Sequence, residues 1–183
     1  FADQLACKSR KGSLRVLEAD FYTVSLPGRF DLVTYWDGFG VGSDADQRRL
    51  LQRIARDWLE PHGMVLMDVF NPFKAALDSG SEVVLDPLKG VEGSVKMVNR
   101  HYFDPESSRW IDEWQPFDHP EHTLAQTLRC YSPADLNLLL EGTGLKIKHI
   151  EVDGKPISFE ENWVRKGDSV LTDWSYLVQL ARV

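Results

Sequence analysis

The stretch that decides the fold reads Arg29-Phe-Asp-Leu-Val-Thr-Tyr-Trp-Asp-Gly-Phe-Gly-Val-Gly-Ser-Asp-Ala-Asp46. Its first part, Phe30 to Tyr35, is apolar on both faces, which predicts a buried parallel strand. Glycines at positions 38, 40 and 42 then indicate a loop, and Ser43 or Asp44 can cap a helix that follows directly. Open α/β sheets form ligand crevices in this way, at the carboxyl ends of their strands.

The segments around this loop continue the alternation of strands and helices. Met64 to Val69 is a second apolar run, and the short joins predict a parallel crossover from the first strand. A short apolar strand is expected at Leu14 to Leu17, and residues 1–10 read as the tail of a helix. Pro61-His62-Gly63 should end the helix between the two strands. One buried stripe is predicted for that helix, from Leu50, Leu51, Ile54, Ala55 and Trp58.

The pattern changes from residue 82 onward. Asp104 to Ser108 reads as a hairpin connection between two extended segments. We therefore predict an antiparallel β insert over residues 76–127, beside an α/β domain made of residues 1–75 and 128–183. The extended segments of the insert are expected at residues 82–85, 94–103, 109–115 and 123–131.

The chain returns to the α/β pattern after the insert. Ser132-Pro133 marks the start of a helix, because proline is favoured at the first helical position. Two strands are then expected, at Leu145 to Val152 and at Trp174 to Val183, with a polar loop containing Trp163 between them. The buried face of the helix would carry Leu136, Leu139 and Leu140.

Composition and charge restrict the classes of partner. The 183 residues are 43% apolar and 27% charged, which is typical of a soluble globular domain. A formal net charge of −7 disfavours nucleic acid, because binding to phosphates needs a basic surface. No apolar run approaches the ~20 residues of a membrane span. Cys7 and Cys130 match no zinc or redox spacing, so we interpret both as reduced packing residues in a cytoplasmic protein.

Two short segments carry groups suited to a ligand. Asp20 precedes Phe21, so a carboxylate could accept a hydrogen bond from an exocyclic amine while an aromatic side chain covers the ring. The alternative is a carboxylate that only caps a turn. The loop from Trp36 to Gly40 offers backbone N–H groups, the Asp37 carboxylate and aromatic rings, although its glycines could serve backbone geometry alone.

In their order along the chain, these pieces resemble the downstream half of a class I S-adenosylmethionine-dependent methyltransferase of the small-molecule type. The resemblance covers about residues 14–72 and 128–183. It implies an α/β, Rossmann-like methyltransferase sheet whose third to seventh strands are present and whose first two are absent. The matching pieces are Glu18-Ala-Asp-Phe21, Arg29-Phe-Asp-Leu-Val33, the 36–42 loop, Leu59-Glu-Pro-His-Gly-Met-Val-Leu66, Tyr131-Ser-Pro-Ala-Asp-Leu136 and Glu141-Gly-Thr-Gly-Leu145.

The resemblance also implies S-adenosylmethionine as the cofactor and a set of residues that bind it. The implied residues are Ala19, Asp20, Phe21, Tyr35, Trp36 and Asp37. In the family, the acid matching Asp20 binds the adenine amine, and the residues after the fourth strand line the methionine part. The first strand, the Gly-x-Gly-x-Gly loop and the acid that holds the ribose would lie before residue 14. We therefore expect an upstream segment to complete the site, and the chain shown to be inactive alone.

The insert is the expected cover of the acceptor site. Trp110, Asp112 and Trp114 share one face of a strand by alternation. Two aromatic rings beside a carboxylate could hold a cationic or amine-bearing acceptor. The alternative is that both tryptophans pack the insert onto the α/β domain. His101 and Tyr102 could also reach an acceptor.

The implied reaction is transfer of a methyl group from S-adenosylmethionine to a small-molecule acceptor. His119 and His122 lie in a segment broken by proline, so no metal site is predicted. A hydroxyl acceptor needs a base or a metal, which favours an amine oriented by Tyr35, Asp37 or His101. O-methylation, a nicotinamide-dependent oxidoreductase and a non-catalytic α/β binding module remain alternatives. The aromatic content of the insert makes a homodimer a further expectation.

Overall fold

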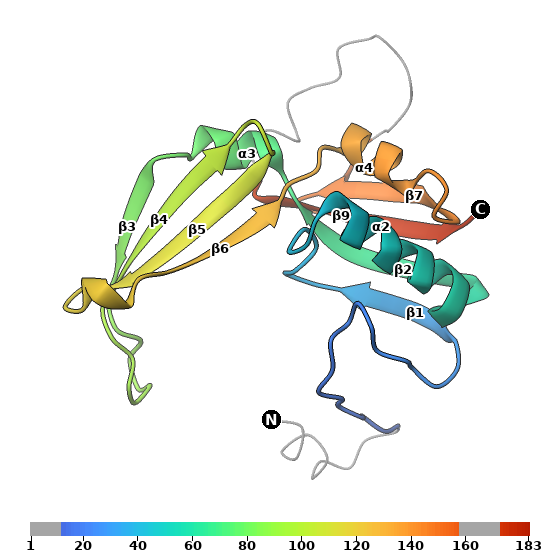
Figure 1. Cartoon of the computed structure of the whole chain (residues 1–183), viewed down its shortest axis with the longest axis horizontal. Helices are drawn as coiled ribbons and strands as arrows, with labels where there is room; N and C mark the ends of the chain where they lie inside the picture. Colours follow the sequence, from blue (N-terminus) through green and yellow to red (C-terminus); the bar gives the residue numbers. More distant parts are fainter. Residues whose placement is uncertain (1–11, 158–172) are drawn as a thin grey trace.

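A computed structural model gives the fold for residues 12–157 and 173–183. Two sheets organise it, one with five strands and one with four (Figure 1). The helix tail expected at residues 1–10, Cys7 and Trp163 fall outside the described residues.

The five-stranded sheet contains the predicted parallel crossover. Its part of the chain forms β1 (Phe30–Tyr35), α2 (Asp44–Arg53), a π-helical segment (Ile54–Trp58), β2 (Leu59–Phe70), α3 (Pro72–Leu77), α4 (Pro133–Leu140), β7 (Leu145–Val152), β8 (Lys155–Pro156) and β9 (Ser175–Arg182). The strand order is β1-β2-β9-β7-β8. β1 and β2 pair in parallel, which confirms the crossover through α2. β7 and β9 confirm the two strands expected after the helix, and β9 pairs antiparallel with both β2 and β7.

α2 and α4 lie over the same face of this sheet and enclose the main hydrophobic core (Figure 1). The predicted stripe on the first helix is confirmed, because all five of its side chains are buried. α4 begins after Ser132 as predicted and buries Leu136, Leu139 and Leu140. Within the described part of the chain, no helix combines the length and the apolar character needed to span a bilayer.

The first helical segment ends earlier than the sequence suggested. The helix stops at Trp58, and Pro61-His62-Gly63 lies inside β2 instead of forming a turn. Gly63 explains why this strand can run so close to β1. A Cβ atom on Gly63 would meet the carbonyl oxygens of Phe30 and Asp31 at 3.0 Å. Glycine therefore serves the approach of two strands here.

The second sheet is the predicted antiparallel insert. It consists of β3 (Ser81–Leu85), β4 (Met97–Asp104), β5 (Arg109–Pro116) and β6 (Leu124–Arg129), with a 3₁₀ turn at Pro120–His122 before the last strand. All three neighbouring pairs are antiparallel. Its base packs on the α/β part through a second core that includes Phe70, Trp110 and Cys130. Cys130 is a free, buried thiol, as expected for a packing residue.

β1 is an edge strand of the described sheet, not the buried central strand that its composition predicted. Phe30 is 39% exposed and Leu32 is 48% exposed, because no described strand pairs with the outer edge of β1. The prediction of a strand at Leu14 to Leu17 was wrong. This segment is exposed and unpaired in the described structure, and a four-residue segment with three apolar side chains does not form a strand without a neighbouring strand.

The start of α2 yields a prediction about pH. Ser43 and Asp46 form a capping box, in which Ser43 Oγ accepts from the Asp46 N–H at 3.2 Å and Asp46 Oδ2 accepts from the Ser43 N–H at 3.0 Å. Hydrogen bonds from Ser43 lower the pKa of Asp46. A lowered pKa stabilises the fold above the unfolded value of about 3.9, and this stabilisation is lost as pH falls through the folded value.

We therefore expect Asp46→Asn to lower the unfolding midpoint in urea at neutral pH. The difference from the wild type should shrink as the pH falls below about 4. Asp31→Asn is the matched control, because Asp31 is exposed on β1 and makes no side-chain hydrogen bond within the described residues. An equal loss for both variants, or a loss independent of pH, would contradict the role of the capping box.

Candidate functional site

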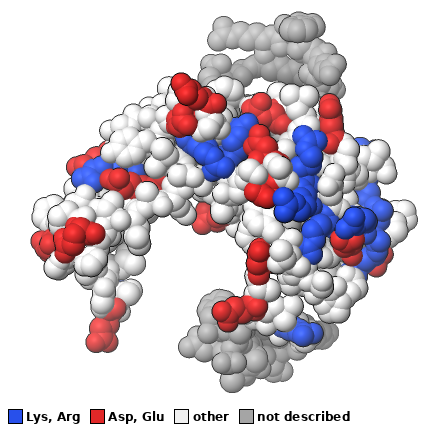
Figure 2. Space-filling view, in the orientation of Figure 1, with Lys and Arg blue, Asp and Glu red and all other residues white. Residues whose placement is uncertain are grey.

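The candidate site lies at the C-terminal ends of β1 and β2. The loop of residues 36–43 leaves β1 there and runs past the base of the antiparallel sheet before α2 begins (Figure 1). Figure 2 shows an open hollow between the arm formed by the antiparallel sheet and the α/β part. Such a position, outside the carboxyl ends of parallel strands, is where α/β sheets bind ligands.

Gly40 of this loop serves a close contact with the antiparallel sheet. Gly40 has φ +110, and a Cβ atom there would lie 2.2 Å from the carbonyl oxygen of Arg129. The Arg129 N–H donates to the Gly40 carbonyl at 2.8 Å, and Arg109 Nη2 donates to the Gly42 carbonyl at 2.7 Å. At Gly40 the requirement is thus one of backbone geometry, as the alternative interpretation proposed.

Two carboxylates meet where the strands end. Asp37 adopts φ +54, a left-handed conformation that costs an L-residue roughly 1–2 kcal/mol. Its N–H donates to Asp68 Oδ1 at 2.8 Å. Burial raises the pKa of Asp68, and the charge of Asp37 adds to this, while the hydrogen bond from Asp37 opposes it. Neither side chain forms an ion pair within residues 12–157 and 173–183.

Sequence reasoning included Asp37 but missed Asp68. Asp68 lies inside the otherwise apolar strand β2, close to its end at Phe70. This position was the only feature of the sequence that pointed to Asp68. Parallel register places it beside the loop, because Tyr35 pairs with Met67. A carboxylate near the end of a strand that follows a crossover was the available clue.

Tyr35 and Trp36 flank the same crevice in different ways. The Tyr35 hydroxyl donates to the Gly38 carbonyl at 3.0 Å, and burial raises the pKa of this phenol well above its usual value. Tyr35 therefore acts as a hydrogen-bond donor to the loop and not as a base. Trp36 is 53% exposed. Phe21 approaches Tyr35 with ring centroids 5.5 Å apart, so these predicted residues lie together.

Asp20 lies at a turn, with Ala19 exposed next to it. Asp20 Oδ1 accepts from the Tyr22 N–H at 2.8 Å, and its carbonyl accepts from the N–H groups of Thr23 and Val24. The side chain is exposed, and its second oxygen has no partner within the described residues. Its role toward adenine stays a prediction.

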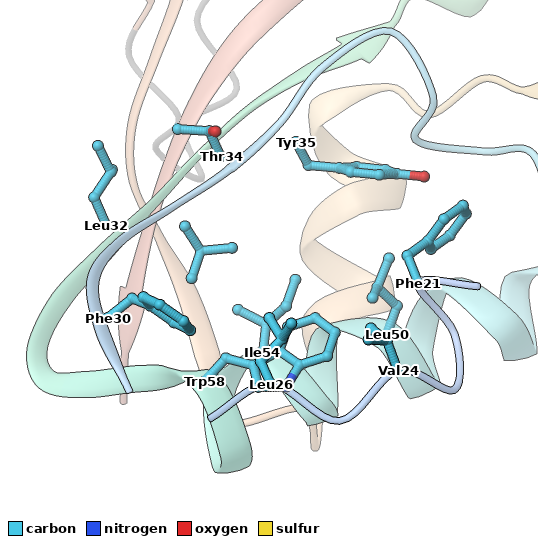
Figure 3. Close-up of a pocket in the computed structure, with 11 residues that line it drawn as sticks. Phe21, Val24, Leu26, Phe30, Leu32, Thr34, Tyr35, Leu50, Ile54 and Trp58 are labelled. Carbon is cyan, nitrogen blue, oxygen red and sulfur yellow. The ribbon is translucent and has the colours of Figure 1, made fainter. Parts of the chain in front are cut away.

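An apolar cavity of about 310 Å³ runs along the free edge of β1 (Figure 3). Phe21, Val24 and Leu26, from the segment before β1, line it together with Phe30 of β1 and Leu50 of α2. These side chains suit apolar groups and offer no partner for a charged one. The cavity is therefore apolar, whereas the carboxylate pair at the strand ends is acidic.

The predicted acceptor residues of the insert occupy one face of the antiparallel sheet. Trp110 is buried against Phe70 and Trp174 at the base of the sheet. Asp112 is 4% exposed and accepts hydrogen bonds from Asn99, Trp114 and Gln126 at 2.7–3.1 Å. Trp114 is 36% exposed.

The structure thus places Trp110 in packing contacts and leaves Trp114 open to the solvent. Binding of an acceptor by Trp110, Asp112 and Trp114 stays a prediction. Tyr102 does not join them, because alternation along β4 turns it to the opposite face.

His101 shares the face of Trp110 and has a defined tautomer. Its Nδ1 lies 3.1 Å from Trp110 Nε1. An indole nitrogen only donates, so Nδ1 must accept, and in the neutral imidazole the proton lies on Nε2. Nε2 makes no hydrogen bond within the described part of the chain. His101 can therefore present an N–H donor to a ligand, but not a free Nδ1 base.

Comparison with known structures places this arrangement in a known fold. No family model matches the chain, and no curated protein matches it. Among solved structures, the CcbJ methyltransferase from Streptomyces caelestis superposes with a TM-score of 0.65 at 18% identity, over 90% of this chain and 62% of that one. The fold is that of the S-adenosylmethionine-dependent methyltransferases.

Two further solved methyltransferase structures also match the fold of this chain. An S-adenosylmethionine-dependent methyltransferase from Clostridium acetobutylicum matches with a TM-score of 0.65 at 13% identity, over 98% of this chain and 67% of that one. A sugar N-methyltransferase from a Streptoalloteichus species matches with a TM-score of 0.57 at 18% identity, over 90% and 61%. The chain thus spans about three fifths to two thirds of these methyltransferase structures.

The contact at Gly40 predicts how this methyltransferase fold responds to a single methyl group. Gly40→Ala should be less stable than Gly28→Ala by about 1–3 kcal/mol, the usual cost of overpacking. Gly28 is the matched control, because its φ is also positive at +89 but nothing lies within 4 Å of its added Cβ. Urea unfolding of both variants measures the difference. Equal losses would mean that only the backbone conformation matters at Gly40.

The tautomer of His101 can be tested directly. Trp110→Phe keeps an aromatic ring in the packing but removes the N–H donor to Nδ1. We expect nitrogen NMR of the neutral imidazole to show the Nε2–H tautomer in the wild type and a mixture of tautomers in the variant. Trp114→Phe removes an indole N–H that bonds to Asp112 instead, so it should leave His101 unchanged. A mixed tautomer in the wild type would contradict the assignment.

Proposed function

We propose that the protein transfers a methyl group from S-adenosylmethionine to the amine of a small-molecule acceptor. The methyltransferase fold supports the reaction class, and the sugar N-methyltransferase among the similar structures supports the acceptor class. The observation that carries the choice of an amine is the pair of carboxylates, Asp37 and Asp68, at the strand ends. A site with two carboxylates and no paired cation attracts a positively charged group.

The residues present fit one side of the proposed cofactor. Among the described residues nothing bonds to the second carboxylate oxygen of Asp20, which could accept from the adenine amine, and Phe21 and Tyr35 supply apolar rings beside it. Trp36 and Asp37 would line the methionine part, at the end of β1. The cofactor supplies an activated methyl group on a sulfonium.

The chain's own groups would then bind and orient the acceptor. Asp37 and Asp68 would attract the protonated amine to the crevice, since opposite charges attract strongly where water is partly excluded. Asp68, whose pKa burial raises, would take the proton that frees the nitrogen lone pair. His101 would donate an N–H to a polar substituent of the acceptor. The insert would shield the reacting atoms from water.

We further propose that the reaction takes place in the cytoplasm. The buried free thiol of Cys130 supports a reducing environment, since disulfides are rare there.

Titration of the full-length protein with S-adenosylhomocysteine tests the cofactor. At a ligand concentration of 100 times Kd, binding should stabilise the fold by about 2.7 kcal/mol. Absence of any shift in the melting temperature would remove the methyltransferase proposal and favour a non-catalytic binding module.

Methyl transfer to amino sugars and to their hydroxyl counterparts then tests the acceptor. We expect transfer to the amines, and Asp37→Asn should lower kcat/KM by about tenfold or more through loss of a charged hydrogen-bond partner. Asp31→Asn, a carboxylate at the other end of β1, should leave it unchanged. Transfer to the hydroxyl compounds alone would overturn the choice of an amine.

A further inference from the structure

We propose that Asp68 is a positioning residue, which holds Asp37 in its left-handed conformation and so sets the direction of the loop that leaves β1. This role belongs to the free protein and requires no ligand. It rests on the proposed function only where methyl transfer is the readout.

The contact between the two residues carries the inference. Asp37 is one of three non-glycine residues with positive φ in the described structure, and it is the only one of them at the end of a parallel strand. Asp68 Oδ1 accepts from its N–H at 2.8 Å. β1 and β2 are in parallel register up to Tyr35 and Met67, so Asp68 stands directly beside the turn.

The same hydrogen bond compensates an unfavourable conformation. A left-handed backbone is disfavoured for a residue with a Cβ atom, and it persists only where the surroundings impose it. Hydrogen bonds to a charged acceptor are stronger than those between neutral groups. A carboxylate at position 68 is therefore suited to this task, even though its half-buried location costs solvation.

Other contacts hold the loop beyond Asp37 in place. The backbone conformation at position 37 therefore sets the direction in which the chain leaves β1. The Tyr35 hydroxyl bonds to the Gly38 carbonyl, and Gly40 pairs with Arg129. Between the end of β1 and these contacts the chain turns at Asp37, where the side chains of both Trp36 and Asp37 are exposed. Without Asp68, position 37 can relax toward an ordinary conformation, and the carboxylate moves with it.

A double-mutant cycle in the full chain tests this role without a cofactor. Asp68→Ala should lower the melting temperature in the wild-type background. The loss should become clearly smaller when Asp37 is also changed to Gly, because glycine adopts positive φ unaided. Asp68→Asn keeps an oxygen acceptor and should retain most of the stability. Glu60→Ala, a carboxylate on the same strand without a hydrogen-bond partner in the described residues, is the control.

Proton NMR gives a second readout that a general loss of packing would not produce. The Asp37 amide proton should move with pH as the Asp68 carboxylate titrates, with Asp37 and the Tyr35 phenol as the neighbouring groups that titrate. The part of this dependence that comes from Asp68 should disappear in Asp68→Asn and persist in Glu60→Ala, while any part that comes from the carboxylate of Asp37 itself remains in both variants. The proposal would be overturned if the chemical shift of the Asp37 amide proton did not depend on Asp68. It would also be overturned if Asp68→Ala cost the same stability in both backgrounds.

Catalysis separates this proposal from the proposed function. If both hold, Asp68→Ala should lower kcat/KM for methyl transfer by about tenfold or more, equivalent to about 1.4 kcal/mol. If the amide readout succeeds while no methyl transfer occurs in the wild type, the positioning role stands and the proposed function fails.

Discussion

The backbone contact between Gly40 and Arg129 is the constraint on which the arrangement of this protein depends. It joins the loop after β1 to the last strand of the antiparallel sheet, at a distance that no residue with a Cβ atom allows. Arg109 adds a second tie to the same loop at Gly42. The two sheets therefore meet at the loop that borders the crevice, and a shift of the insert is transmitted to the candidate site. Packing of Phe70 against Trp110 supports the same junction from the end of β2.

Electrostatics give the crevice its chemical character. Asp37 and Asp68 bring two acidic groups together at the ends of neighbouring strands, and the described residues provide no basic side chain to neutralise them. The apolar cavity along β1 lies beside them but offers no charged group. On the facing insert, Asp112 is buried and satisfied by three donors, which stabilises the sheet. The charge available to a ligand is therefore concentrated at the strand ends.

Much of the fold was predictable because it follows from periodicity and caps. The helical stripe from Leu50 to Trp58 and the capping positions at Ser43 and Ser132 are local patterns, and the structure confirms them. The exposure of β1 was not predictable, because its apolar composition is the same whether or not a neighbouring strand pairs with it. The segment at Leu14 to Leu17 shows the same limit, since strand formation needs a partner that composition does not specify.

By itself, the sequence determined the order of strands and helices, the antiparallel insert and the likeness to a methyltransferase, because these depend on residue patterns along the chain. Only the tertiary structure decided which groups meet. The contact of Asp68 with Asp37 spans 31 positions, and that of Arg129 with Gly40 spans 89, so both depend on strand register and sheet packing. The glycine loop was recognised as important from the sequence. Its direction, its tie to the insert and its second carboxylate follow from how two sheets pack together.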